Sequence, residues 1–176
     1  MEVILIRHTS VNVPPGTCYG QTDVPVAVTF DQEAAATKQV LESYGKIEKA
    51  YTSPLTRAWL LAAYCGYPDA ETDSRLLEMS MGDWEMQRYE AISDPYIQEW
   101  YDDYLHLPTP NGESFVQQRQ RVGAFLDELR QQPYRRVAIF AHGGVLACAG
   151  IYGRLYTMEE AWDNLTPYGG IISIEI

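Results

Sequence analysis

The chain has 176 residues, with 24 acidic and 13 basic side chains and a formal net charge of −11. This length suits one domain with a sizeable core, and the negative charge argues against nucleic-acid binding, which needs clustered lysine and arginine. No apolar run is long enough to cross a bilayer, and the N-terminus lacks a signal-peptide pattern. We therefore expect a single cytoplasmic domain over residues 1–176 with no membrane partner. No sequence pattern indicates its oligomeric state.

The first half of the chain alternates apolar strands with helices. Residues 2–7 (EVILIR) are apolar on both faces, which is typical of a central strand in a parallel sheet covered by helices. Residues 31–44 are rich in helix formers and precede a glycine, and a short strand is expected within residues 46–54. Residues 55–66 (LTRAWLLAAYCG) then resume a helical pattern that also ends in glycine.

The pattern weakens between about residues 70 and 112, where aromatic and acidic residues mix before a proline-rich loop. We expect this segment to be a cap of short helices and loops inserted over the sheet edge. A helix over 113–132, a strand over 135–142 (RRVAIFAH), a helix from residue 143 and a last strand at 169–176 complete the order. Such alternation predicts an α/β fold, a three-layer α/β/α sandwich with a mostly parallel central sheet.

Two of the predicted strands end directly in a histidine. VILIRH leads to His8 and VAIFAH leads to His142, and each is followed by residues suited to a turn and a helix start. Ligands of open α/β sheets bind outside the carboxyl ends of the strands, so the two imidazoles are neighbours there if their strands are adjacent. A purely structural role for each histidine is the competing interpretation.

A metal site is a second alternative, since imidazole is a common metal ligand. The sequence has no HExxH or HxH pattern and places Arg7 beside His8, where its positive charge opposes a cation. Arg57 lies early in the helix after the second strand, where it either faces water or lines the same crevice near a helix start. Arginine beside histidine favours an anion instead, most simply a phosphate group.

These residue types suit phosphoryl transfer. A neutral imidazole can attack phosphorus in line and form a phosphohistidine, while arginines and a second histidine stabilise charge on the equatorial oxygens. The leaving oxygen needs a proton donor, and the segment LLEMSMGDWE offers Glu78 and Glu85. A carboxyl group partly buried among apolar side chains suits that role. A surface role for either glutamate stays open at this point.

Together, the motifs resemble the histidine phosphatase superfamily, in its phosphoglycerate mutase-like branch. The resemblance rests on RH after the first strand, SPLTRA, LLEMSMGDWE, NGESF and AHGG, which follow in this order along the chain. It implies that His8 is the phosphorylated nucleophile, that Arg7 and Arg57 bind the phosphoryl group, that His142 stabilises the transferring group, and that Glu78 is the proton donor. It also implies a phosphoglycerate mutase-like fold, no metal or organic cofactor, and a small phosphorylated substrate.

Within the superfamily, EMSMGDWEM, EWYDDY and PTPNGESF are most similar to the α-ribazole phosphatases. The resemblance implies hydrolysis of α-ribazole 5′-phosphate in assembly of the cobalamin lower ligand. The short span between Glu78 and NGES favours a phosphatase, because the phosphoglycerate mutases carry a longer insertion there. A broad-specificity phosphatase, a mutase and a non-catalytic phospho-ligand binding module are the alternatives, and the complete set of site residues speaks against the last.

The loop after His8 departs from the superfamily pattern. Thr9 replaces the usual glycine, and Val11 and Pro14 stand where threonine and asparagine usually help to hold phosphate. We expect other residues to contact the substrate, and the candidates are Asn12, Tyr19, Gln21, Thr22, Trp84 and Gly143. Aromatic residues of the 70–112 segment either stack on an aromatic base or pack within the insertion.

Overall fold

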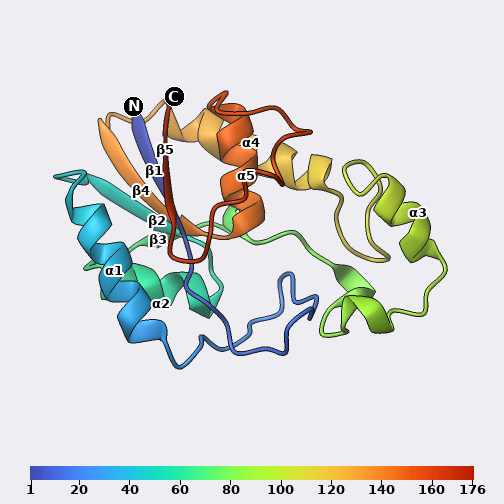
Figure 1. The fold of residues 1–176 in the computed structure, drawn as a ribbon. Helices are drawn as coiled ribbons and strands as arrows, with labels where there is room; N and C mark the ends of the chain where they lie inside the picture. The colour runs from blue at the N-terminus through green and yellow to red at the C-terminus, as the bar shows by residue number, and fades with distance from the viewer.

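The computed structural model describes residues 1–176 and has a central sheet with helices on both faces (Figure 1). The sheet is ordered β3-β2-β4-β1-β5, with β5 antiparallel to β1 and the other neighbours parallel. The predicted three-layer α/β/α sandwich with a mostly parallel sheet is confirmed. Its strands are β1 (Glu2–Arg7), β2 (Lys49–Thr52), β3 (Glu71–Thr72), β4 (Arg136–Ala141) and β5 (Ile171–Glu175).

Both faces of the central strands are buried. On one face, Ile4 and Ile6 pack with residues of α1 (Phe30–Glu42) and α2 (Thr56–Tyr64). On the other, Val3 belongs to the core that includes residues of α4 (Phe115–Leu129) and α5 (Gly143–Tyr152). Because successive strand residues point to opposite faces and both faces are covered, the strands are apolar throughout.

The pairing of β1 with β4 places two strand ends side by side. The register runs from Glu2 opposite Arg136 to Arg7 opposite Ala141, so both strands end at the same level of the sheet. The residues that follow Arg7 and Ala141 therefore share one edge of the sheet.

The helix that precedes β4 is α4. It begins at a capping box in which the side chains of Ser114 and Gln117 accept hydrogen bonds from each other's backbone N–H groups.

The segment between β3 and α4 is mostly irregular and extends to one side of the sheet (Figure 1). It contains single 3₁₀ turns and one short helix, α3 (Tyr96–Asp102). Sequence analysis did not predict β3, because its two residues, Glu71 and Thr72, are exposed and carry no apolar pattern. None of the helices combines the length and apolar character needed to span a membrane.

Candidate active site

The carboxyl ends of β1 and β4 bring His8 and His142 together. Both side chains are buried, and their ring centroids lie 5.2 Å apart with the ring planes at 62°. The cause is the in-register pairing of Arg7 with Ala141, which places the next residue of each strand at the same sheet edge. The two histidines are neighbours at the strand ends, where the sequence predicted them.

His8 presents one ring nitrogen to the protein and keeps the other free. Its Nδ1 lies 2.7 Å from the Thr9 carbonyl oxygen, which accepts the Nδ1 proton and leaves Nε2 with its lone pair. Burial, followed by the charges of Arg57 and Arg7, lowers the pKa of His8 from 6.5 to about 3. The imidazole is therefore neutral at physiological pH, the state required of a nucleophile.

His142 is held by Ser53, a residue just beyond β2 that sequence analysis did not single out. Its Nε2 lies 2.7 Å from Ser53 Oγ, while its Nδ1 is buried without a partner. Burial, together with His8 and Arg57, holds the pKa of His142 well below its usual value. A bound phosphoryl group opposes this effect, because nearby negative charge favours the protonated ring. One ring nitrogen of His142, Nδ1, therefore has no hydrogen-bond partner within the protein.

Arg7 and Arg57 direct two guanidinium groups to the same region, and backbone carbonyls rather than carboxylates hold them. Arg57 is fully buried and donates to the carbonyl oxygens of Gly20 and Thr22 at 2.7 and 2.9 Å. Arg7 Nη1 donates to the Thr166 carbonyl oxygen at 2.6 Å. The Nε groups of both arginines are buried with no partner. Buried charges are usually paired with an opposite charge, and neither guanidinium group has a carboxylate partner. The two groups therefore favour an anion between them.

Glu78 lies beside the second histidine. Its Oε2 accepts the backbone N–H of Gly144, in the first turn of α5, at 3.2 Å. Its Oε1 accepts the Met79 N–H and the side-chain amide of Gln118, each at 2.9 Å. The carboxyl group is therefore held from three directions next to the helix that begins after His142.

Glu85, the other glutamate of the same segment, instead holds the loop that contains Gln21 and Thr22. It accepts the backbone N–H groups of Gln21 and Thr22 at 2.9 and 2.7 Å, the Thr22 hydroxyl, and the Met81 N–H at 3.0 Å. These contacts fix the loop whose carbonyls hold Arg57. The geometry therefore favours Glu78 over Glu85 as a proton donor. No group of three His, Cys, Asp or Glu side chains is arranged to hold a metal ion.

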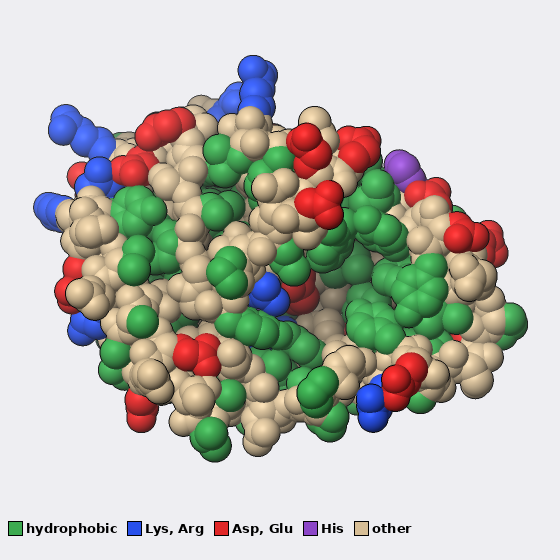
Figure 2. Space-filling model, viewed as in Figure 1, with side chains coloured by type: hydrophobic (Ala, Val, Ile, Leu, Met, Phe, Trp, Pro, Cys, Tyr) green, Lys and Arg blue, Asp and Glu red, His purple; other side chains and the backbone are tan.

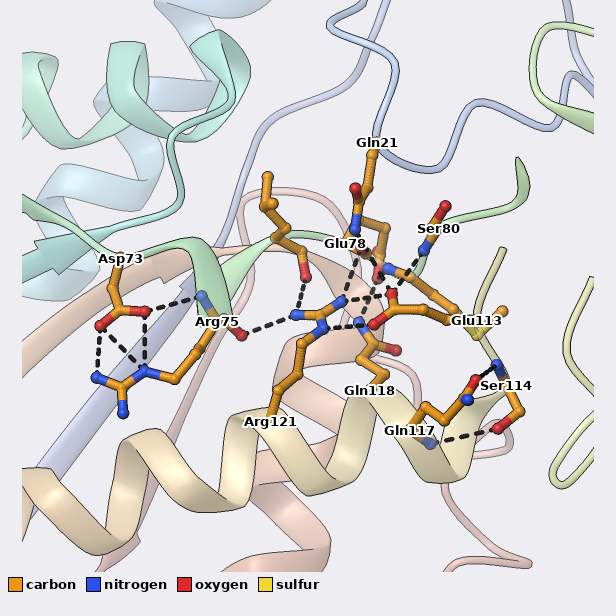
Figure 3. Close-up of polar contacts among 12 residues, drawn as sticks. Gln21, Asp73, Arg75, Glu78, Ser80, Glu113, Ser114, Gln117, Gln118 and Arg121 are labelled. Atoms are coloured by element: carbon orange, nitrogen blue, oxygen red, sulfur yellow. Dashed lines mark hydrogen bonds and ion pairs between the residues drawn. The ribbon is translucent and has the colours of Figure 1, made fainter. Parts of the chain in front are cut away.

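A largely buried ion pair fixes the backbone of Glu78 (Figure 3). Arg121 of α4 lies 2.7 Å from Glu113 and donates to three carbonyl oxygens within residues 75–78. Glu113 also accepts the Ser80 N–H at 2.8 Å. Sequence analysis missed this network, although Glu113 belongs to the NGESF motif. It anchors the backbone on both sides of Glu78.

Two tyrosines border the site beside the two arginines. The Tyr19 ring lies 5.2 Å from the Arg57 guanidinium, and its hydroxyl is 2.8 Å from that of Tyr168. Tyr168 in turn lies 4.2 Å from the Arg7 guanidinium and 5.5 Å from the His8 ring. Tyr19 was a predicted substrate contact, whereas Tyr168 lies in an irregular segment that offered no sequence signal.

The other candidates from the loop after His8 are engaged within the protein or lie apart. The Gln21 side chain donates to the Glu78 carbonyl oxygen at 2.9 Å, and the Thr22 hydroxyl donates to Glu85. Asn12 is exposed, and its backbone N–H bonds the Pro25 carbonyl oxygen. The structure therefore gives Gln21 and Thr22 a role in shaping the loop.

Trp84 differs from the expectation of direct substrate contact, and Gly143 lies against Arg7. Trp84 is 2% exposed and packs at right angles to Trp100, with ring centroids 5.5 Å apart. It is part of the hydrophobic core. Gly143 provides space, because a Cβ there would lie 3.1 Å from Arg7 Cζ. Its missing side chain lets the guanidinium lie against the start of α5.

A hollow opens over this region (Figure 2). Charged side chains lie at its floor and hydrophobic side chains form much of its wall. The apolar part is a cavity of about 410 Å³ whose lining residues are Met79, Tyr89, Trp100, Tyr101, Tyr104 and Trp162.

The parallel strands of this α/β sandwich end at a site that favours an anion, and the site contains an unprotonated imidazole nitrogen. This arrangement is typical of phosphoryl-transfer enzymes. Comparison with known proteins gives the family. The chain belongs to the histidine phosphatase superfamily (branch 1), whose family model matches residues 3–176.

Three similar proteins cover almost the whole chain. It is 34% identical to the adenosylcobalamin/alpha-ribazole phosphatase of Escherichia coli (strain K12) over 188 residues, 100% of this chain and 90% of the relative. A solved structure provisionally named alpha-ribazole-5′-P phosphatase, from Escherichia coli str. K-12 substr. MG1655, has a TM-score of 0.87 and 25% identity, and covers 98% and 89% of the two chains. A phosphoglycerate mutase from Thermus thermophilus has a TM-score of 0.78 and 25% identity, and covers 99% of this chain and 93% of the mutase. The fold is phosphoglycerate mutase-like, and the chain is a phosphoric monoester hydrolase.

Proposed function

We propose that the chain hydrolyses its substrate through a phosphohistidine intermediate on His8. In the first step His8 Nε2 attacks phosphorus, and the new N–P bond forms as the bond to the ester oxygen breaks. The Glu78 carboxyl group gives that oxygen its proton, so the alcohol leaves neutral. Arg7 and Arg57 hold the remaining phosphoryl oxygens, and His142 donates to one of them as negative charge concentrates there.

The second step reverses the roles of acid and base. A water molecule attacks the phosphohistidine, and the Glu78 carboxylate takes the proton that this water loses. The N–P bond breaks, inorganic phosphate leaves, and His8 returns to its neutral form. Glu78 again carries the proton needed for the next turnover, so the cycle balances without an additional reactant.

One observation carries this proposal. The contact of His8 Nδ1 with the Thr9 carbonyl oxygen leaves the Nε2 lone pair free, and the charges of Arg57 and Arg7, each with a buried Nε–H that has no partner, act on this ring. A binding module has no use for an unprotonated nitrogen among cations. A nucleophile for phosphorus needs that arrangement, because the anion is held while the imidazole stays neutral.

The proposed substrate is α-ribazole 5′-phosphate, whose dephosphorylation belongs to assembly of the cobalamin lower ligand. The 34% identity to an adenosylcobalamin/alpha-ribazole phosphatase supports this choice. The aromatic lining of the hollow also supports it, because the substrate carries an aromatic base. The similarity to a phosphoglycerate mutase structure makes mutase activity the second candidate.

The test is phosphate release from a panel of α-ribazole 5′-phosphate, 3-phosphoglycerate, sugar phosphates and nucleotides. Each assay is run with and without EDTA, and beside His8→Ala. We expect phosphate release that EDTA does not change and that His8→Ala abolishes. Wild-type turnover in His8→Ala would overturn the phosphohistidine mechanism, and loss of activity in EDTA would indicate a metal-dependent reaction.

The same panel separates the two candidates when the 3-phosphoglycerate assay also contains a bisphosphate primer. A mutase converts 3-phosphoglycerate to its isomer, needs a bisphosphate primer and releases little phosphate. We expect phosphate release and no isomer. If α-ribazole 5′-phosphate is hydrolysed no faster than simple sugar phosphates, the specific substrate is wrong while the phosphatase activity remains.

A further inference from the structure

The cavity defined above by six apolar and aromatic residues begins one residue from the proposed acid. Met79 follows Glu78 in the chain, and its N–H donates to the Glu78 carboxylate at 2.9 Å. The lining also includes Trp162, from the C-terminal part of the chain. The cavity therefore adjoins the side of the active site where Glu78 lies.

The position of the acid dictates where the rest of the substrate lies. The oxygen that Glu78 protonates is the one that joins phosphorus to the leaving group. That group must therefore extend from Glu78, and the arginine and histidine side chains occupy the phosphate side. The space next to Glu78 is the aromatic cavity.

We propose that this cavity is the subsite for a planar aromatic ring system carried by the leaving group, an inference that rests on the proposed function. Its occupant is a heteroaromatic base attached to a phosphorylated sugar. The subsite makes the enzyme selective for base-bearing phosphates over small charged ones such as phosphoserine or phosphoglycerate.

The packing of the walls suits such an occupant. Trp100 lies 6.0 Å from Tyr104, and Tyr104 meets Trp162 edge to face at 5.9 Å, so the rings support one another. Trp162 also packs on the buried Phe115, with ring centroids 5.4 Å apart. A wall of mutually packed aromatic rings loses little freedom when a flat ligand binds against it.

The chemistry of the lining excludes the small charged substrates. None of the six lining residues is an acidic or basic residue, so a carboxylate or ammonium group placed there would lose hydration without gaining a partner of opposite charge. An aromatic base has no such cost and gains from stacking and from the burial of apolar surface. Selectivity in this subsite comes from both effects.

The experiment compares α-ribazole 5′-phosphate with ribose 5-phosphate, which has the same phosphorylated sugar without the base. The cavity variants are Tyr101→Ala and Trp162→Leu. The control is Tyr64→Ala, because Tyr64 lies outside the cavity and its exposed fraction, 37%, is close to the 45% of Tyr101. We expect the base to raise kcat/KM by about 10- to 100-fold in the wild type and in the control, the range typical of base stacking on aromatic rings. In both cavity variants this advantage falls to a few-fold, because kcat/KM for α-ribazole 5′-phosphate falls much more than kcat/KM for ribose 5-phosphate.

The outcomes separate the subsite from the activity. Equal kcat/KM for the two substrates in the wild type would overturn the subsite and leave the phosphatase intact. The same follows if both cavity variants keep the full advantage of the base. Loss of both substrates in Trp162→Leu signals misfolding, and Tyr101→Ala then decides the question because its side chain is half exposed. Failure of the wild type to release phosphate from any substrate would instead refute the proposed function.

Discussion

The substitution Glu78→Gln removes the proposed acid with little change of shape. The amide oxygen can keep the two hydrogen bonds that Oε1 now accepts from Met79 and Gln118 at 2.9 Å. The amide nitrogen then faces the Gly144 N–H, which Oε2 accepts at 3.2 Å in the wild type. One hydrogen bond is lost, a cost of about 1 kcal/mol. We therefore expect a folded variant with an intact phosphate site and no proton to donate.

The effect on rate depends on the leaving group. General acid catalysis contributes about 10²- to 10⁴-fold when the leaving oxygen is a poor one. Ribose 5-phosphate releases an alkoxide that needs a proton, whereas p-nitrophenyl phosphate releases a stable phenolate. For Glu78→Gln we expect kcat/KM to fall by about 10³-fold for ribose 5-phosphate and by less than about 10-fold for p-nitrophenyl phosphate.

Phosphate release from both substrates measures this difference, and Glu85→Gln is the matched control. Glu85 holds the loop around Thr22, so its replacement is expected to slow both substrates by a similar factor. If Glu78→Gln slows the two substrates equally, Glu78 is not the acid and the reasoning from its position fails.

Three further predictions concern the support of the site. A Cβ at Gly144 would overlap Glu78 Oε1, so Gly144→Ala is expected to lower kcat/KM for ribose 5-phosphate by about 100-fold. The control is Gly123→Ala in α4, which should keep full activity because a Cβ there has no neighbour within 4 Å. Similar activity of the two variants would show that crowding at Gly144 does not matter. Arg121→Met removes the ion pair with Glu113 and the arginine's hydrogen bonds to three carbonyl oxygens, and should lower the free energy of unfolding in urea by about 3 kcal/mol. A loss below about 1 kcal/mol would contradict this. Folding lowers the pKa of His8 from 6.5 to about 3. Between pH 6.5 and about pH 3 the unfolded chain therefore binds more protons than the folded chain, and the free energy of unfolding should decrease as the pH falls through this range. The His8 contribution is up to about 1.4 kcal/mol per pH unit, and an unchanged slope in His8→Gln would refute it.

The strands and their ends could be predicted because both rest on local chemistry. A strand that is buried on both faces is apolar throughout, so β1 and β4 were evident, and the carboxyl-end rule placed His8 and His142 together. The strand β3 was not predictable, since its two exposed residues take their conformation from pairing with β2.

The surroundings of the site depend on contacts between distant segments. Tyr168 and Trp162 reach the site from irregular chain that has no periodicity to detect. The residue pattern alone left Glu78 and Glu85 equivalent, and only the family resemblance favoured Glu78. In the folded chain their hydrogen bonds differ. Trp84 was a reasonable candidate for an exposed aromatic, but its burial beneath Trp100 depends on how the insertion folds.

The central claim is that His8 carries the phosphoryl group during turnover. Mixing the enzyme with a phosphorylated substrate, quenching within milliseconds at alkaline pH, where phosphohistidine survives, and mapping the modified peptide by mass spectrometry tests it directly. We expect a phosphoryl group on the peptide that contains His8, formed and lost at rates fast enough for turnover, and no such peptide in His8→Ala. Full turnover without a phosphoenzyme, or a phosphoryl group on another residue, would contradict the mechanism.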